Sequence, residues 1–393
     1  MPNLVKLFWR FLLIGSTSFG GYMALIAMVR NRFVTKEKLI DDAAITEGIA
    51  IASVLPGPVA VNVVAYTGYV LAGVAGAIVS VIAVLIPSFF LITAFAVLYF
   101  NYGEIVSANA VLKGVIPVIV ALLLAVAVTM GLNNIRKISE WVIVALAASV
   151  FLLFPGYGSI VGLFLLGAFK GIVLTNKKSS VTEQQASSVR FSHVLIIVFV
   201  FLMGLLVYSV VLYFFPEDSG VRLFSIFSSV SLTLFGGGYV MVPILKSILV
   251  DKTQWFTLTE FLAGISAGQI TPGPILISAA FFGYKIKGVT GAVIATIAIF
   301  LPSSLLMILV SKFFSRYKSN RFVQAALAGI KPVVVGLILA AAFSVLGNYW
   351  PGANPFATII ILVVSFLLIF RFKINPVILV AISGLAGYLF YSQ

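Results

Sequence analysis

A Pro-Gly-Pro sequence occurs twice in this chain, and each copy interrupts an apolar stretch. The first copy is Leu55-Pro56-Gly57-Pro58 and the second is Thr271-Pro272-Gly273-Pro274. Proline lacks the backbone N–H and clashes with the preceding helical turn, and glycine adds backbone freedom, so neither motif readily continues a helix. Each motif therefore predicts that one helix ends before it and that another begins at its second proline.

The sequence around both motifs is that of a membrane protein. Hydrophobic side chains make up 62% of the 393 residues, and charged side chains make up only 9%. Apolar runs such as 74–98 and 289–310 reach the roughly 20 residues that cross a bilayer core. The chain has no cysteine and one histidine, which excludes disulfides and cysteine metal sites, and we expect no metal and no cofactor. It also lacks a nucleotide-binding loop, a zinc-binding pair and a catalytic triad, so we do not expect an enzyme.

The chain contains an internal repeat. Phe19-Gly20-Gly21 recurs 216 positions later as Phe235-Gly236-Gly237, and the two Pro-Gly-Pro motifs have the same offset. Several landmarks at one spacing and in one order predict a duplication. We expect a first repeat over residues 1–175, a polar cytoplasmic linker over 176–192, and a second repeat over 193–393 that has one additional span.

The basic residues predict how the two repeats are oriented. If both motifs form re-entrant hairpins, an inverted second repeat puts 19 of the 25 basic residues on the cytoplasmic side, as the positive-inside rule favours. A parallel second repeat puts fewer there. The predicted fold is therefore an all-α polytopic protein with two inverted repeats and broken or re-entrant helices. We expect it in the plasma membrane of a prokaryote, since inverted repeats are typical of secondary transporters.

The two Pro-Gly-Pro breaks are the candidate ligand site. Irregular backbone at membrane depth is tolerated only when it is buried in protein or lines a wet cavity, and a new helix directs its free N–H groups at whatever lies beside the break. The Phe-Gly-Gly motifs can expose backbone N–H groups in the same way. For each motif, the alternative is close helix packing without a ligand. The predicted substrate-binding residues are Gly20, Gly21, Ser53, Pro56, Gly57, Pro58, Asn62, Tyr66, Gly236, Gly237, Gly238, Gln269, Thr271, Pro272, Gly273, Pro274 and Ser278.

Two charged residues are further candidates. Glu47 lies nine positions before Pro56, and an acid within an apolar helix is a candidate for proton or cation coupling. The alternative is an acid that faces interfacial water. Lys331, beside Pro332, can attract anions at the inner mouth, although its alternative is to reach the lipid headgroups.

These motifs resemble the chromate ion transporter family in its long, two-domain form. Tyr66-Thr67-Gly68-Tyr69, Phe235-Gly236-Gly237-Gly238-Tyr239 and the run from Gly268 to Pro274 carry the resemblance, together with the motifs above. The resemblance implies export of chromate, driven by the membrane potential or by ion exchange. Sulfate or another anion, including an organic one, is the alternative cargo.

An anion channel or a non-transporting membrane subunit is the alternative from a different functional class. The expected partners are a small oxyanion and the lipid bilayer, with a homodimer left open. Nucleic acid is not expected, because the basic residues that give the net charge of +14 are scattered through short loops.

Overall fold

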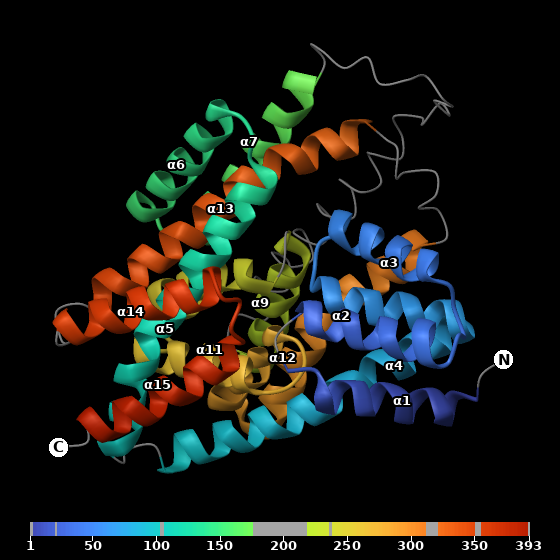
Figure 1. The fold of residues 1–393 in the computed structure, drawn as a ribbon, viewed down its shortest axis with the longest axis horizontal. Helices are drawn as coiled ribbons and strands as arrows, with labels where there is room; N and C mark the ends of the chain where they lie inside the picture. Colours follow the sequence, from blue (N-terminus) through green and yellow to red (C-terminus); the bar gives the residue numbers. More distant parts are fainter. Residues whose placement is uncertain are drawn as a thin grey trace.

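The computed structural model describes residues 3–19, 22–102, 106–175, 218–235, 238–311, 321–349 and 355–391, and all its regular elements are helical. The first repeat comprises α1 (Leu4–Thr17), α2 (Tyr22–Arg30), the π-helical turn η1 (Asn31–Lys36), α3 (Asp42–Val54), α4 (Val59–Tyr102), α5 (Val106–Asn134), α6 (Ile138–Leu153) and α7 (Tyr157–Thr175). Figure 1 shows α1 and the last helix, α15, toward opposite ends of the molecule.

The second repeat follows the same order. It comprises α9 (Ser219–Thr233), the 3₁₀ turn η2 (Gly238–Val240), α10 (Met241–Leu245), the π-helical turn η3 (Lys246–Lys252), α11 (Leu258–Ile270), the 3₁₀ turn η4 (Ile275–Ile277), α12 (Ser278–Ser311), α13 (Arg321–Tyr349), α14 (Pro355–Phe370) and α15 (Pro376–Tyr391). The predicted linker and the additional span at 194–215 lie outside the described residues.

The long helices α4 and α12 each contain a sharp reversal at a glycine. Gly73 has a φ of 65° and Gly288 has a φ of 59°, a backbone region that favours glycine. The two arms of each helix then meet at small residues. A Cβ on Gly68 would lie 2.5 Å from the Gly76 carbonyl oxygen, and one on Gly283 would lie 2.2 Å from that of Gly291. Each Pro-Gly-Pro motif is thus followed by a short arm and then by a longer helix.

Among the described residues, four helices are long and apolar enough to cross a membrane: Val59–Tyr102, Lys113–Asn134, Ile275–Ser311 and Gln324–Gly347. The reversal at Gly73 means that the crossing part of α4 is its second arm. Large apolar side chains on this arm are exposed, including Phe90 at 66% and Leu98 at 60%. Such an exposed apolar surface is expected for a helix that contacts lipid.

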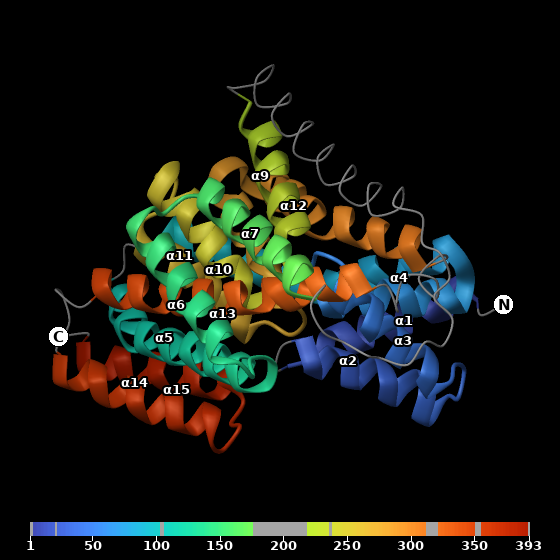
Figure 2. The same cartoon turned by 90° about the horizontal axis from the view of Figure 1, so that it is seen from above.

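The two repeats are interlaced rather than separate. Helix α5 of the first repeat packs against α14 and α15 of the second, and α13 of the second packs against α6 and α7 of the first. Glycines permit these close crossings, because a Cβ on Gly114 would strike the Ser383 carbonyl and one on Gly329 would strike that of Gly167. Figure 2 shows α14 and α15 beside α5, and α6 and α7 beside α13.

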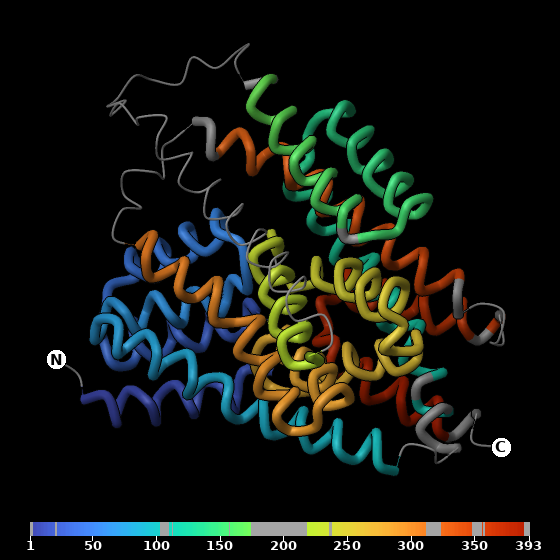
Figure 3. The backbone as a smooth tube through the Cα atoms, turned by 180° about the vertical axis from the view of Figure 1, so that it is seen from behind, coloured from blue at the N-terminus to red at the C-terminus, as the bar shows by residue number. Residues whose placement is uncertain are grey.

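Helices α1 and α9 occupy equivalent places in the two repeats. Helix α1 packs along α4, and α9 packs along α12, as Figure 3 shows for the second pair. The basic segment that follows α2 is helical, because Asn31–Lys36 continues α2 as a π-helical turn. Ion pairs from Glu37 to Arg10 and Arg32 hold the end of that turn against α1.

Candidate functional site

The first Pro-Gly-Pro motif is the tip of a helical hairpin. Helix α3 runs to the motif and the first arm of α4 runs back, so that Tyr66 packs against Gly48. Gly57 at the tip has a φ of 111°, which is strained for any residue with a Cβ. The new helix begins at Val59, one residue later than predicted. Pro58 therefore caps the helix with its carbonyl, which accepts a hydrogen bond from the Asn62 N–H at 3.0 Å.

The second motif forms an equivalent hairpin from α11 and the first arm of α12. Phe281 and Phe282 pack against Gly264 across this hairpin. Gly273 has a φ of 100°, and Pro274 is the extended residue that precedes the 3₁₀ turn η4. Here too the predicted start at the second proline is one residue early, since helical backbone begins at Ile275.

Each hairpin tip is held by the opposite repeat. The Gly57 N–H donates to the Leu234 carbonyl at 2.7 Å, and the Gly273 N–H donates to the Ser18 carbonyl at 2.8 Å. Ser18 and Leu234 end α1 and α9 at equivalent positions of the two repeats. These two N–H groups are consequently used for assembly and are not free to bind a ligand in this conformation.

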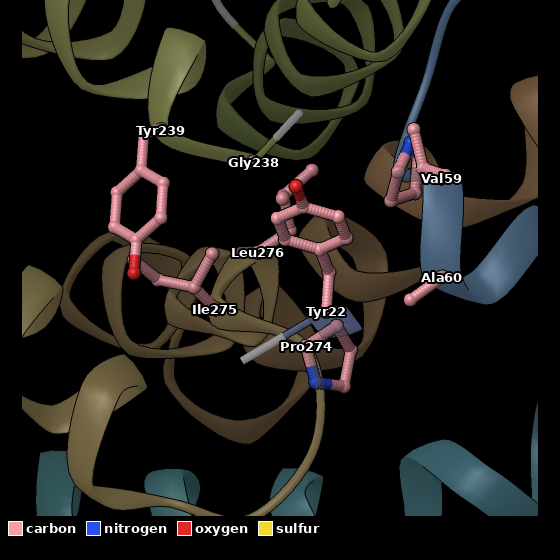
Figure 4. A pocket seen from close by; sticks show the side chains of 9 residues that line it. Tyr22, Val59, Ala60, Gly238, Tyr239, Pro274, Ile275 and Leu276 are labelled. Carbon is pink, nitrogen blue, oxygen red and sulfur yellow. The ribbon is translucent and has the colours of Figure 1, made fainter. Parts of the chain in front are cut away.

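A small pocket lies where the tips and the Phe-Gly-Gly segments converge. Its lining comes from both repeats: Tyr22, Pro58, Val59, Ala60, Gly238, Tyr239, Pro274, Ile275 and Leu276. Most of these residues form pairs at equivalent positions, so the pocket lies between the two repeats. Figure 4 shows Tyr22 and Tyr239 approaching it from different elements. The space measures about 20 Å³, roughly that of one water molecule, so the pocket is closed to an oxyanion in this conformation.

The pocket can attract an anion through its backbone. The first N–H groups of a helix have no partner within the helix, and the positive end of the helix dipole lies there. Val59 and Ala60 open one helix, and Ile275 and Leu276 open the other, so both helix starts face the same space. Among the lining residues there is no lysine or arginine. The arrangement is suited to binding a small anion with neutral donors.

The predicted site residues differ in where they lie relative to the pocket. Pro58, Gly238 and Pro274 line the pocket, while Pro56, Gly57, Pro272 and Gly273 form the buried tips beside it. Gly20, Gly21, Gly236 and Gly237 lie outside the described residues.

Four predicted polar side chains hydrogen-bond to their own helix or loop. The acceptors are the Ile49 carbonyl for Ser53, the Pro56 carbonyl for Asn62, the Gly268 carbonyl for Thr271, and the Ile275 carbonyl for Ser278. The ligand role of these four side chains stays a prediction.

The two charged candidates lie away from the pocket lining. Glu47, on α3, is half-buried and is a hydrogen-bonding neighbour of the Tyr66 side chain. Lys331 is exposed on α13. Within the described residues, no group of three or more His, Cys, Asp or Glu side chains is placed to hold a metal ion.

Sequence reasoning missed Tyr22 and Tyr239. Both line the pocket, and both follow a Phe-Gly-Gly motif by one or two positions. That proximity to a predicted break was the available signal.

Comparison with known proteins supports a transport role. The chain is 30% identical over 395 residues to an uncharacterised transporter from Methanocaldococcus jannaschii, covering 99% of this chain and 94% of the relative. It is 28% identical to a chromate transport protein from Pseudomonas aeruginosa, covering 98% and 92%. It is 26% identical to a chromate transport protein from Cupriavidus metallidurans, covering 99% and 94%.

No solved structure matches the chain. The family model described as chromate transporter matches twice, at residues 5–172 and 221–388, and these two matches contain the two hairpins and the pocket between them. Both halves of the chain therefore belong to the chromate transporter family, and the protein is a membrane transporter rather than an enzyme.

Proposed function

We propose that this protein is a secondary carrier of inorganic oxyanions and that it exports chromate across the plasma membrane of a prokaryote. The observation that carries the proposal is the pocket on which two helix N-termini converge. A dianion there can accept hydrogen bonds from both helix starts without a buried cation. The relatives named as chromate transport proteins support chromate as the cargo.

A carrier must open its site to the two sides in turn, and the hairpins suggest how. Helix α11 packs against α5 and α15, whereas within the described residues α3 makes no comparable packing with the equivalent helices α13 and α7. The repeats thus adopt two different arrangements of the same parts. If the two repeats exchanged these arrangements, α3 would pack against α13 and α7, and α11 would separate from α5 and α15. This exchange would move access from one side of the pocket to the other.

The inverted orientation is part of this proposal. It is supported by the 19 basic residues that it places on the cytoplasmic side and by the reciprocal bonds of Gly57 and Gly273 to the opposite repeat. It predicts that Asn134 faces the cytoplasm and that Tyr102 faces outward. Single cysteines at these positions of the cysteine-free chain, labelled with an impermeant thiol reagent in intact cells, test it. Labelling of Asn134→Cys from outside contradicts the inverted arrangement.

Transport itself is tested with labelled chromate in inverted membrane vesicles. Uptake should be saturable, should be stimulated by unlabelled substrate on the opposite side, and should be inhibited more by chromate than by sulfate or molybdate. Stronger inhibition by sulfate would indicate that sulfate, rather than chromate, is the transported anion, and the proposal of a carrier would still stand. Flux that neither saturates nor shows counterflow would indicate a channel, and absence of flux would contradict a transport role for the isolated protein.

A further inference from the structure

The pocket lining includes two tyrosines, Tyr22 and Tyr239, whose hydroxyl groups are further hydrogen-bond donors beside the backbone N–H groups. Tyr22 is the first residue of α2, and Tyr239 lies in η2, one position beyond the equivalent of Tyr22. Both side chains line the pocket, one from each repeat. A tyrosine hydroxyl can donate a hydrogen bond to an anion, as a backbone N–H group can.

The two tyrosines enter the pocket from non-equivalent positions for a steric reason. The residue equivalent to Tyr22 in the second repeat is Gly238. A Cβ on Gly238 would lie 2.7 Å from the Ile275 Cγ2 atom and 2.9 Å from the Leu276 Cδ1 atom. A side chain at that position would displace the side chains of Ile275 and Leu276, and the second repeat has its tyrosine at the next residue, Tyr239. Tyr22 projects toward the space that Gly238 leaves open (Figure 4).

Gln269 supplies an independent sign of a missing ligand. Its side chain lies near that of Tyr239. The residue is only 7% exposed, and its Nε2 atom is buried with no hydrogen-bond acceptor among the residues that the structure describes. A buried amide donor without an acceptor costs free energy, so it is retained where a partner is present in another state. A tyrosine hydroxyl that donates to an anion keeps a lone pair that can accept from this amide.

We propose that Tyr22 and Tyr239 are side-chain donors to the bound oxyanion, and that Gln269 orients the Tyr239 hydroxyl toward it. The proposal rests on the transport function above and assigns residues to its site. When the pocket opens, the Tyr22 ring moves aside and its hydroxyl turns to the anion. The chain of donors then runs from the Gln269 Nε2 through the Tyr239 hydroxyl to the anion, which gives the buried Gln269 amide an acceptor.

The test is equilibrium binding of radiolabelled chromate to the purified full-length protein in lipid nanodiscs. Tyr22→Phe and Tyr239→Phe keep the ring and remove only the hydroxyl, so each should raise the dissociation constant about ten- to hundred-fold. Tyr102→Phe is the matched control, because Tyr102 is 65% exposed at the end of α4 and should bind normally. Thermal unfolding of each variant checks that the fold is retained.

Gln269 is tested through its dependence on Tyr239. Gln269→Leu should weaken binding by itself, but adding it to Tyr239→Phe should cause no further loss, because it acts through that hydroxyl. Additive losses would overturn the orienting role. Normal binding by both phenylalanine variants would overturn the inference and leave the transport proposal standing. Absence of saturable chromate or sulfate binding by the unmodified protein would overturn both.

Discussion

The two Pro-Gly-Pro hairpins share a motif and a backbone geometry but differ in how firmly they are held. In α11, every residue from Phe261 to Gln269 is buried, whereas in α3 the buried residues are only Ile45, Gly48, Ile51 and Ala52. The base of the second hairpin is fastened by an ion pair of 2.6 Å between Glu260 and Lys285. The equivalent residues in the first repeat are Ala44 and Tyr69, which cannot form an ion pair.

In the conformation seen here, the α11 hairpin is therefore packed firmly and the α3 hairpin is packed loosely. The α11 hairpin is packed as a fixed wall of the pocket, although an apolar cavity of about 390 Å³ remains between it and α4, α5 and α15. The α3 hairpin carries Glu47 and has an exposed face. Because local stability follows buried contacts, we expect α3 to move first if the protein changes state as the proposed carrier would.

The largest expected effect is at the two tip glycines. A Cβ on Gly57 would lie 2.1 Å from the Ser303 Cβ, whereas one on Gly273 would lie 3.1 Å from the Ser88 Oγ. Both positions have positive φ, which costs a side-chain-bearing residue about 1–3 kcal/mol. Gly57→Ala should therefore abolish chromate flux and lower folded yield, and Gly273→Ala should only reduce flux. Ser303→Gly should partly rescue Gly57→Ala; equal damage at both glycines without rescue contradicts the assigned contact.

A second prediction concerns docking of α3. Ser266 and Val115 line the cavity between α11 and α5, and their repeat equivalents are Ala50 and Ile330. A short thiol cross-linker should join Ser266→Cys to Val115→Cys in the resting protein. It should join Ala50→Cys to Ile330→Cys only during turnover, and that product should stop transport. If the second pair never cross-links while the variant still transports, the two repeats do not exchange arrangements.

Glu47, the acid on the α3 hairpin, provides the third prediction. If Glu47 couples transport to protons, Glu47→Gln should abolish the response of chromate flux to a pH gradient while leaving chromate exchange measurable. Asp41→Asn is the control, since Asp41 is exposed just before α3 and its side chain makes no capping hydrogen bond. Flux in vesicles with and without an imposed gradient is the measurement, and an unchanged gradient response in Glu47→Gln removes this residue from coupling.

The fourth prediction concerns the Glu260–Lys285 ion pair at the base of the α11 hairpin. Its loss should have a smaller effect, on the unfolding temperature, and this effect should depend on pH. Burial alone would raise the pKa of Glu260, but hydrogen bonds from Lys285 and the Thr257 N–H lower it below its ordinary value. A lowered native pKa stabilises the fold above the unfolded pKa, and this stabilisation is lost as pH falls through the native value. Glu260→Gln should thus lower the unfolding temperature at neutral pH, by an amount corresponding to about 1–2 kcal/mol.

The same substitution should change little in acid, where Glu260 is protonated in both states. Glu140→Gln is the matched control, because Glu140 also caps a helix but makes no ion pair across a hairpin. An equal loss at neutral and acidic pH in Glu260→Gln would show that the charge of Glu260 does not fasten the hairpin.

Local chemistry made much of the fold predictable, and tertiary packing explains what was missed. Proline and glycine at 56–58 and 272–274 were sufficient to predict helix breaks and their repetition. The interlacing of α5 with α14 and α15 was not predictable, because it depends on close crossings such as Gly114 against Ser383. The position of Asn62 was foreseen only as one helical turn beyond Pro58, whereas its bond to the Pro56 carbonyl depends on how the tip folds back.

Counterflow in proteoliposomes tests most directly whether an oxyanion is carried between the two hairpin tips. Purified protein is reconstituted with unlabelled chromate inside, and labelled chromate is supplied outside at tracer concentration. We expect label to accumulate transiently above equilibrium in vesicles that contain the unmodified protein, and not in vesicles that contain a folded Gly273→Val variant. Accumulation that persists in that variant would contradict the site, and its absence from the unmodified protein with both chromate and sulfate would contradict the carrier.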